Sequence, residues 1–130
     1  MLLGGGALDG VRILKPETIA LMTRNHIGDL HVGLDGTRPQ AGGEEVRFGL
    51  DFAIHTDPKL AGLPFGTGTY YWGGAAGTWF WIDPVNDLAF VGMIQMQGGY
   101  RPGAMNFRND SAKLVYAALA SASSTRSSQP

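Results

Sequence analysis

The sequence predicts an α+β protein in which an antiparallel β-sheet is flanked by helices. Two apolar runs, Thr78–Ile82 and Leu88–Met96, are rich in aromatic and β-branched residues and are too short for typical helices. Between them lies Asp83–Asp87, whose proline, aspartate and asparagine residues are typical of a hairpin loop. Neither run alternates between polar and apolar residues, so we expect both faces of this central hairpin to be buried.

A third strand is expected just upstream of the hairpin, at Tyr70–Trp72. The segment Gly73–Gly77, which contains only glycine and alanine, joins this strand to the hairpin. Glycine weakens a strand and often marks a place where a ligand or another backbone approaches closely. Two interpretations therefore stay open, a simple bend between strands and a binding site.

The N-terminal part predicts a helix cap, a tight turn and a short helix. Met1–Leu3 followed by three glycines is typical of the last turn of a helix, whose beginning we expect to be missing. Asp9-Gly10 predicts a tight turn before a strand at Val11–Leu14. Pro16 suits the first position of a helix that runs to about Asn25. Its expected inner face consists of Ile19, Met22 and His26.

The rest of the chain predicts one further strand, two loops and a C-terminal helix. Val46–Ile54 is expected to be a single strand, and the glycine-rich stretches 28–45 and 59–69 are expected to be loops. Asn106 or Asn109 can cap a helix that ends near Ala120. The apolar stripe expected on this helix is Phe107, Ser111, Leu114–Val115 and Ala118–Leu119. We therefore expect one domain over residues 1–120 and a flexible tail over residues 121–130.

Composition excludes several classes of function. The 130 residues carry a net charge of −1 and 44% hydrophobic residues, as in an ordinary globular domain. There is no basic stripe for nucleic acid, no apolar run long enough to span a membrane and no cysteine for a disulfide or a thiolate. No phosphate- or dinucleotide-binding loop is complete, so no cofactor is expected. Nothing in the sequence assigns a compartment.

The remaining polar residues suggest no further site. His26 and His31 are five residues apart and His55 stands alone, so we interpret them as surface or turn histidines rather than metal ligands. Glu44-Glu45 lies beside two glycines and is interpreted as a solvated corner rather than an acid/base pair.

Trp72-Gly73-Gly74 and the hairpin that follows it resemble the C-terminal sheet of the serine β-lactamase and penicillin-binding-protein superfamily. The likeness is greatest to its class C-like branch and the family VIII carboxylesterases, in which a Lys-Thr-Gly, His-x-Gly or Trp-Gly-Gly motif lies on the strand beside the catalytic pocket. The resemblance covers most of residues 1–120 and is weakest through residues 28–65. It implies that the backbone N–H of Ala75 is one of two oxyanion-hole donors. It also implies that Trp72, Gly73 and Gly74 contact the substrate.

Two other motifs of that family are absent. No serine precedes Ser111, and neither Ser-x-x-Lys nor Tyr-x-Asn occurs, so this chain has no nucleophile with its base. We therefore expect the C-terminal portion of an esterase-type, acyl-enzyme hydrolase that is inactive by itself and whose partner is the N-terminal remainder of the fold. The expected substrate is a small ester or a β-lactam, and the ester is favoured because Trp72 cannot place a charge near a substrate carboxylate.

A function of a different class stays open on the same residues. Five aromatic residues of the predicted strands could form a strip that binds a carbohydrate or an apolar ligand in a non-catalytic module: Tyr70, Tyr71, Trp72, Trp79 and Trp81. Aromatic side chains also dominate protein cores, so the same residues could simply pack the sheet.

Overall fold

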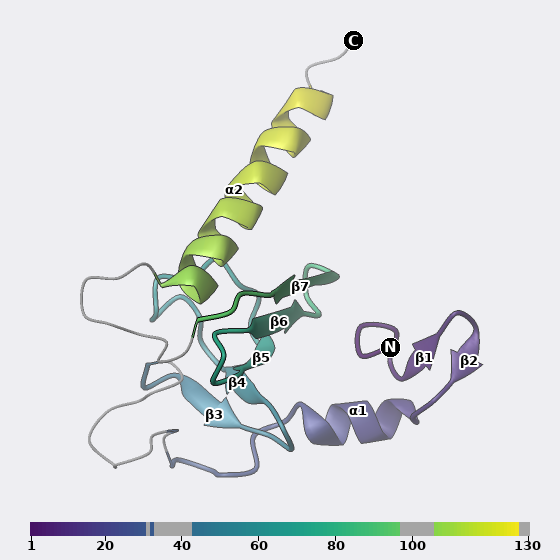
Figure 1. The fold of residues 1–130 in the computed structure, drawn as a ribbon. Helices are drawn as coiled ribbons and strands as arrows, with labels where there is room; N and C mark the ends of the chain where they lie inside the picture. Colours follow the sequence, from purple (N-terminus) through teal and green to yellow (C-terminus); the bar gives the residue numbers. More distant parts are fainter. Residues whose placement is uncertain (31, 33–42, 97–105, 128–130) are drawn as a thin grey trace.

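The computed structural model describes residues 1–30, 32, 43–96 and 106–127 and has the expected α+β architecture (Figure 1). The elements in chain order are β1 (Ala7–Leu8), β2 (Val11–Arg12), α1 (Pro16–Met22), β3 (Val46–Phe48), β4 (Ala53–His55), β5 (Tyr70–Gly73), β6 (Trp79–Asp83), β7 (Leu88–Gly92) and α2 (Phe107–Ser127). Within these residues, β3 to β7 form one antiparallel sheet in sequence order, and β1 and β2 form a separate hairpin.

The central hairpin of the sheet is confirmed as β6 and β7. Trp81 pairs with Phe90 and Asp83 with Leu88 across a turn in which Asp87 has a φ of 50°. The second strand ends at Gly92 rather than at Met96, four residues earlier than expected. The ring of Trp79 covers Gly92 so closely that a Cβ there would lie 2.3 Å from it. Only glycine therefore fits beneath this indole.

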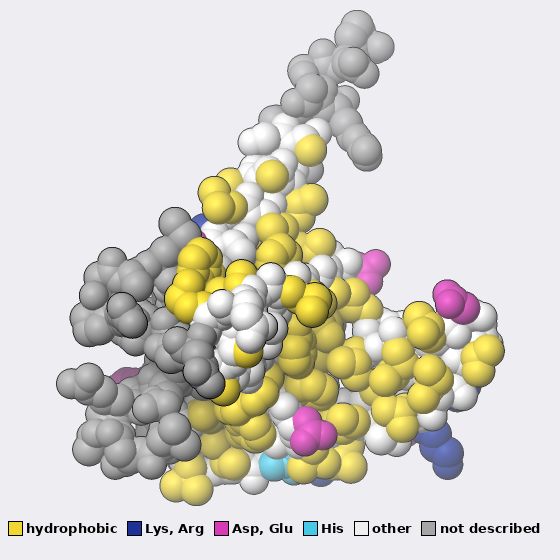
Figure 2. All heavy atoms as spheres, viewed as in Figure 1, with side chains coloured by type: hydrophobic (Ala, Val, Ile, Leu, Met, Phe, Trp, Pro, Cys, Tyr) yellow, Lys and Arg dark blue, Asp and Glu magenta, His cyan; other side chains and the backbone are white. Residues whose placement is uncertain are grey.

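The two faces of the sheet are buried to different extents. The face toward α2 carries a cluster formed by Val46, Ala53, Leu63, Phe65, Tyr71, Trp81 and Ala112. The opposite face carries a smaller cluster of Phe52, Ile54, Tyr70 and Ile82, covered by Leu2, Leu3 and Met22. This cover stops short of β7, where Val91 is 67% exposed and the following Met93 is 80% exposed. The prediction that both faces are buried is thus confirmed for β6 and wrong for the outer residues of β7. Figure 2 shows hydrophobic side chains gathered over the viewed surface of the sheet.

The prediction of one strand over Val46–Ile54 is wrong, because this segment forms the hairpin of β3 and β4. Gly49 N–H donates to the carbonyl of Phe52 at 2.8 Å, and Asp51 reverses the chain with a φ of 71°. Phe48 therefore packs on the α2 side while Phe52 packs on the other side. Gly49 also lies against the Met22 carbonyl, where a Cβ would come within 2.1 Å.

The N-terminal segment has the expected local turns but shorter elements. Gly6 N–H donates to the Met1 carbonyl and Gly5 N–H to the Leu2 carbonyl, each at 3.1 Å, which is the bond pair of a glycine helix cap. Strand β2 ends at Arg12, two residues before the expected end.

Helix α1 begins at Pro16 as predicted but ends at Met22 instead of continuing to about Asn25. Ile19 is buried and Met22 packs against the smaller cluster, as predicted, whereas His26 is exposed. The predicted loop over residues 28–45 lies mostly outside the described residues.

Helix α2 is capped by Asn106, whose Oδ1 accepts the N–H of Asn109 at 3.3 Å. It runs to Ser127, so it extends past the expected end at Ala120 and into the predicted tail. The expected stripe is confirmed in part: Phe107, Ser111 and Val115 contact the sheet, while Leu114 is 72% exposed. Ala112 and Tyr116, which were not expected on this face, also pack on the sheet. Only the first turns of α2 lie against the sheet, and the rest projects away from it (Figure 1). Neither described helix is long and apolar enough to cross a membrane.

Candidate functional site

The motif Trp72-Gly73-Gly74 lies at the end of β5, where the strand turns into β6. Gly73 pairs with Trp79, and Gly74 N–H donates to the Thr78 carbonyl at 2.8 Å. Gly77 N–H then donates back to the Gly74 carbonyl at 3.0 Å, and Gly77 has a φ of 86°. This is a three-residue hairpin loop, in which a tight turn is followed by a glycine in the left-handed region.

Ala75 occupies the second position of this turn and is exposed to solvent. Neither Ala75 nor Ala76 has a positive φ, which makes the turn type I rather than type II. Within the described ranges 1–30, 32, 43–96 and 106–127, no acceptor receives the N–H of Ala75. The loop is held from outside by Met96, whose N–H donates to the Ala76 carbonyl at 2.8 Å. The Ala75 donor is therefore presented on a fixed backbone.

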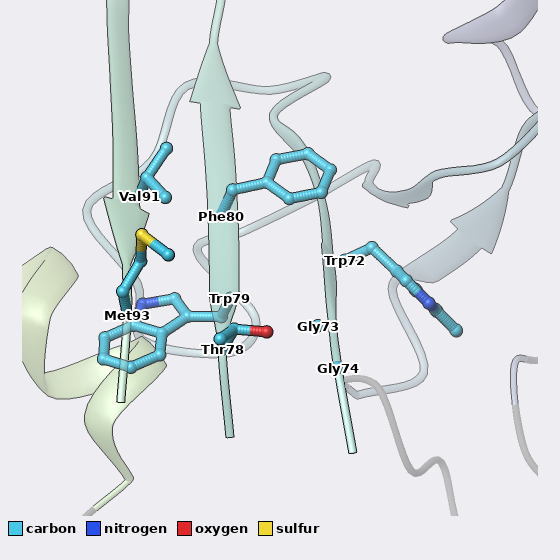
Figure 3. A pocket seen from close by; sticks show the side chains of 8 residues that line it. All are labelled: Trp72, Gly73, Gly74, Thr78, Trp79, Phe80, Val91 and Met93. Atoms are coloured by element: carbon cyan, nitrogen blue, oxygen red, sulfur yellow. The ribbon is translucent and has the colours of Figure 1, made fainter. Parts of the chain in front are cut away.

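A shallow hollow of about 410 Å³ adjoins the motif (Figure 3). Apart from the hydroxyl of Thr78 and the glycine backbone, its lining is apolar and comprises Trp72, Gly73, Gly74, Thr78, Trp79, Phe80, Val91 and Met93. Figure 3 shows Trp72 extending away from the side chains of Phe80, Val91 and Met93. Trp72 is 41% exposed and contacts the ring edge of Phe48, with centroids 5.2 Å apart. The structure thus brings the three motif residues to one hollow, with Ala75 at the next position along the chain.

The aromatic strip does not form one binding surface. Tyr70, Tyr71 and Trp81 are buried in the two clusters, and Trp79 stacks on Phe90 with centroids 6.1 Å apart. Core packing, the second interpretation of these aromatic residues, is confirmed for the three buried ones.

Asp83 fixes the far end of the same hairpin. Its carboxylate is buried and accepts the backbone N–H groups of Gly66 at 2.7 Å and Val85 at 3.0 Å. It also accepts the N–H and side-chain amide of Asn86 and the hydroxyl of Tyr116. Burial alone would raise the pKa of Asp83, but the hydrogen bonds from Tyr116, Gly66 and Asn86 outweigh it and hold the pKa below its ordinary value. One ionised side chain thus ties the turn, the loop before β5 and α2 together.

Glu45 and His55 form a buried pair that sequence reasoning missed. His55 is 2% exposed and Glu45 is 5% exposed, and His55 Nδ1 lies 3.3 Å from Glu45 Oε1. The interpretations of His55 as a surface or turn histidine and of Glu45 as part of a solvated corner are therefore wrong, although Glu44 is exposed as expected. The one available signal was that His55 directly continues the apolar run Phe52–Ile54.

The pair is surrounded by aromatic rings and a cation. The His55 ring stacks on Tyr71 with centroids 4.6 Å apart, and Arg108 Cζ lies 4.8 Å from the centroid of the Tyr71 ring. Burial lowers the pKa of His55, and the raising effect of Glu45 does not overcome it. Burial likewise raises the pKa of Tyr71. His55 is consequently neutral at pH 7. Among the described residues, no group of three histidine, aspartate or glutamate side chains is placed to hold a metal ion.

Comparison with known proteins identifies the family. The family model for beta-lactamase matches residues 5–114. Two curated relatives from Mycobacterium tuberculosis are each 41% identical over 102 residues: the uncharacterized protein MT1414 of strain CDC 1551 / Oshkosh and protein Rv1367c of strain ATCC 25618 / H37Rv. The match covers 73% of this chain and 24% of each relative, so the chain spans about a quarter of their length.

A solved structure supports the same assignment. EstCE1, described as a hydrolase with promiscuous acyltransferase activity, superposes with a TM-score of 0.58 at 29% identity. The superposition covers 74% of this chain and 22% of EstCE1. Together with the family match over most of the sequence, it supports a beta-lactamase-like hydrolase fold for this chain. The chain therefore belongs to the beta-lactamase family.

Proposed function

We propose that this chain supplies the oxyanion-donor strand and one wall of the substrate pocket in a serine hydrolase that cleaves small esters through an acyl-enzyme. The observation that carries the proposal is the backbone N–H of Ala75. This N–H lies in an exposed turn beside an apolar hollow, and no described residue accepts a hydrogen bond from it. Donors held in place before the reaction stabilise the charge that develops on a carbonyl oxygen in the transition state.

The nucleophile in this proposal comes from outside these 130 residues. The sequence contains no Ser-x-x-Lys, and its first serine is Ser111 in α2. Ser111 accepts a hydrogen bond from Trp79 Nε1 at 3.3 Å and donates to the Arg108 carbonyl at 2.9 Å, so its hydroxyl has a structural role. The partner is then the remainder of a beta-lactamase-like fold, and the purified chain alone will not hydrolyse p-nitrophenyl esters.

An uncharged ester fits the hollow better than a β-lactam carboxylate. The side chains that line it are apolar except for the Thr78 hydroxyl. Trp72 stands at the position where family members with Lys-Thr-Gly place a cation, and an indole offers no charge to a carboxylate. Trp72→Ala should therefore change KM and substrate preference more than kcat.

A chimera provides the test of the donor. The segment of EstCE1 that matches this chain is replaced by the chain itself, and hydrolysis of a short-chain p-nitrophenyl ester is measured. Ala75→Pro deletes the N–H and should lower kcat by about 10²–10³, the usual loss for one oxyanion donor. Proline is favoured at the second position of a type I turn, so the variant should fold. Ala75→Gly keeps the donor and is the matched control.

The two variants distinguish the loss of the Ala75 N–H donor from a disruption of the turn. Ala75→Gly should retain kcat to within a few fold, because the methyl group takes no part in the chemistry. Ala75→Pro with wild-type melting and undiminished kcat would exclude Ala75 from the mechanism. A chimera that is folded and inactive even with the wild-type segment would count against the proposed function as a whole.

A further inference from the structure

A polar cluster lies behind the motif strand, on the side of the sheet that faces α2. It consists of Glu45 before β3, His55 in β4, Tyr71 in β5 and Arg108 in the first turn of α2. The first three are almost fully buried. They are linked by the contact between Glu45 and His55 and by the stacking of His55 on Tyr71. The residue before β3, two strands and a helix thus contribute one side chain each to a chain of contacts that ends at Arg108.

Arg108 contacts the motif through a glycine. The guanidinium lies over the Tyr71 ring, and a Cβ built on Gly73 would lie 3.2 Å from Arg108 Nη2. That separation is tighter than most Cβ contacts, so the guanidinium lies directly against Gly73 and would have to shift slightly if this residue carried a side chain. The same hypothetical Cβ on Gly73 would lie 3.2 Å from the Thr78 carbonyl oxygen. Gly73 is therefore enclosed between Arg108 and the β6 end of the loop.

We propose that Arg108 is a positioning residue, which holds the Gly73–Ala75 backbone in place and so fixes the direction of the Ala75 N–H. This inference rests on the proposed function of Ala75. Arginine suits the role because its planar guanidinium can stack on an aromatic face while its edge meets backbone. Tyr71 is itself held by His55 and the sheet, so the guanidinium has a rigid support. Arg108 thus links the first turn of α2 to the geometry of the motif.

Hydrogen exchange in the purified chain tests this independently of catalysis. The reporter is the Gly74 amide, which donates to the Thr78 carbonyl and protects the base of the loop. Arg108→Met should increase its exchange rate by about tenfold, because local opening of the loop becomes easier. Arg108→Lys keeps a charge but not the planar group, and it should restore only part of the protection.

Two control variants distinguish the positioning of the motif backbone by Arg108 from a general weakening of the packing of α2. Lys113→Met removes an exposed cation from the same helix, and Val115→Ala weakens the packing of α2 without touching Gly73. Both should leave Gly74 exchange within about twofold of wild type. Wild-type exchange at Gly74 in a folded Arg108→Met protein would overturn the proposal, as would an equal effect of Val115→Ala. If Arg108→Met does not fold, the same comparison is made with Arg108→Lys, which must accelerate Gly74 exchange for the proposal to stand.

The chimera with EstCE1 supplies the functional measurement. There Arg108→Met should lower kcat by about tenfold with KM nearly unchanged, because a misdirected donor weakens transition-state stabilisation and not substrate binding. Faster Gly74 exchange without any change in kcat would refute the link between Arg108 and the reaction. Failure of the proposed function is recognised separately, because it would appear as wild-type activity in Ala75→Pro.

Discussion

Asp83→Asn tests whether the buried carboxylate organises the hairpin, and the structure gives its expected cost. Oδ1 accepts the N–H groups of Val85 and Asn86, and Oδ2 accepts Gly66 N–H, the Asn86 amide and Tyr116. Asparagine offers one carbonyl oxygen and one NH₂ group. Whichever way the amide is turned, its NH₂ group faces at least two N–H donors. Tyr116 can rotate its hydroxyl, but the N–H groups cannot.

The expected loss of folding free energy is about 2–4 kcal/mol. A buried donor that loses its acceptor costs about 1–3 kcal/mol, and the donors of Val85 and Asn86 can recover part of this from water because both residues are exposed. With a urea m value of about 2 kcal/mol/M, in the middle of the usual range for small proteins, the unfolding midpoint should fall by about 1–2 M. Tryptophan fluorescence and far-UV circular dichroism measured on the same samples establish whether the two transitions coincide.

Asp87→Asn is the matched control for this measurement. Asp87 lies in the same turn, is exposed and has a φ of 50°, a conformation that asparagine adopts readily. Its substitution should change stability by no more than about 0.5 kcal/mol. Equal effects of the two substitutions, or a midpoint in Asp83→Asn that equals the wild-type value, would refute the reasoning.

The pH dependence gives a second check on Asp83. Its pKa in the folded state lies below the ordinary value, so the carboxylate stabilises the fold above about pH 4. This stabilisation is lost as the pH falls through the folded-state pKa. The difference between wild type and Asp83→Asn should therefore be full at pH 7 and shrink below about pH 4.

Two further predictions concern His55 and the open face of the sheet. The pKa of His55 is lowered in the folded state, because burial disfavours the charged ring. The fold is therefore stabilised by neutral His55 above the unfolded-state pKa of about 6.5, and this stabilisation is lost as the pH falls through the folded-state pKa. Wild-type melting temperatures should therefore fall as the pH drops below about 6.5. The variant His55→Gln does not titrate and should give a flatter profile, and parallel profiles would contradict this. The apolar residues beside β6 should make the chain bind a hydrophobic dye, and Val91→Lys with Met93→Lys should reduce the binding whereas Leu114→Lys on α2 should not. A monomeric wild-type chain with a sharp transition and no dye binding would show that this face needs no partner.

The sequence by itself determined the elements whose signals are local. The two runs around Asp83–Asp87 specify the central hairpin, because aromatic and β-branched residues favour strands and the Asp/Pro/Asn cluster favours a turn. Pro16 and Asn106 mark the helix starts for equally local reasons, the fixed φ of proline and the side-chain acceptor of asparagine. The motif Trp72-Gly73-Gly74 is likewise a local sequence feature, and in the structure it lies beside a hollow.

Only the tertiary structure decided which side chains meet. Val46–Ile54 has the alternation of one strand, and its reversal at Asp51 depends on the close contact of Gly49 with the Met22 carbonyl. The packing of Ala112 and Tyr116 on the inner face of α2 depends on the core cluster beneath the helix and on the bond from Tyr116 to Asp83.

The polar cluster at the candidate site likewise could not be predicted from the sequence alone. Glu45, His55 and Arg108 carry no shared sequence pattern, because they lie on separate elements that approach one another only when the sheet and α2 pack. The burial of Glu45 and His55 reverses what their residue types suggest, since charged and titratable side chains are usually exposed unless a partner satisfies them. Local chemistry thus determined where the backbone turns, and long-range packing determined which charges lie behind the motif.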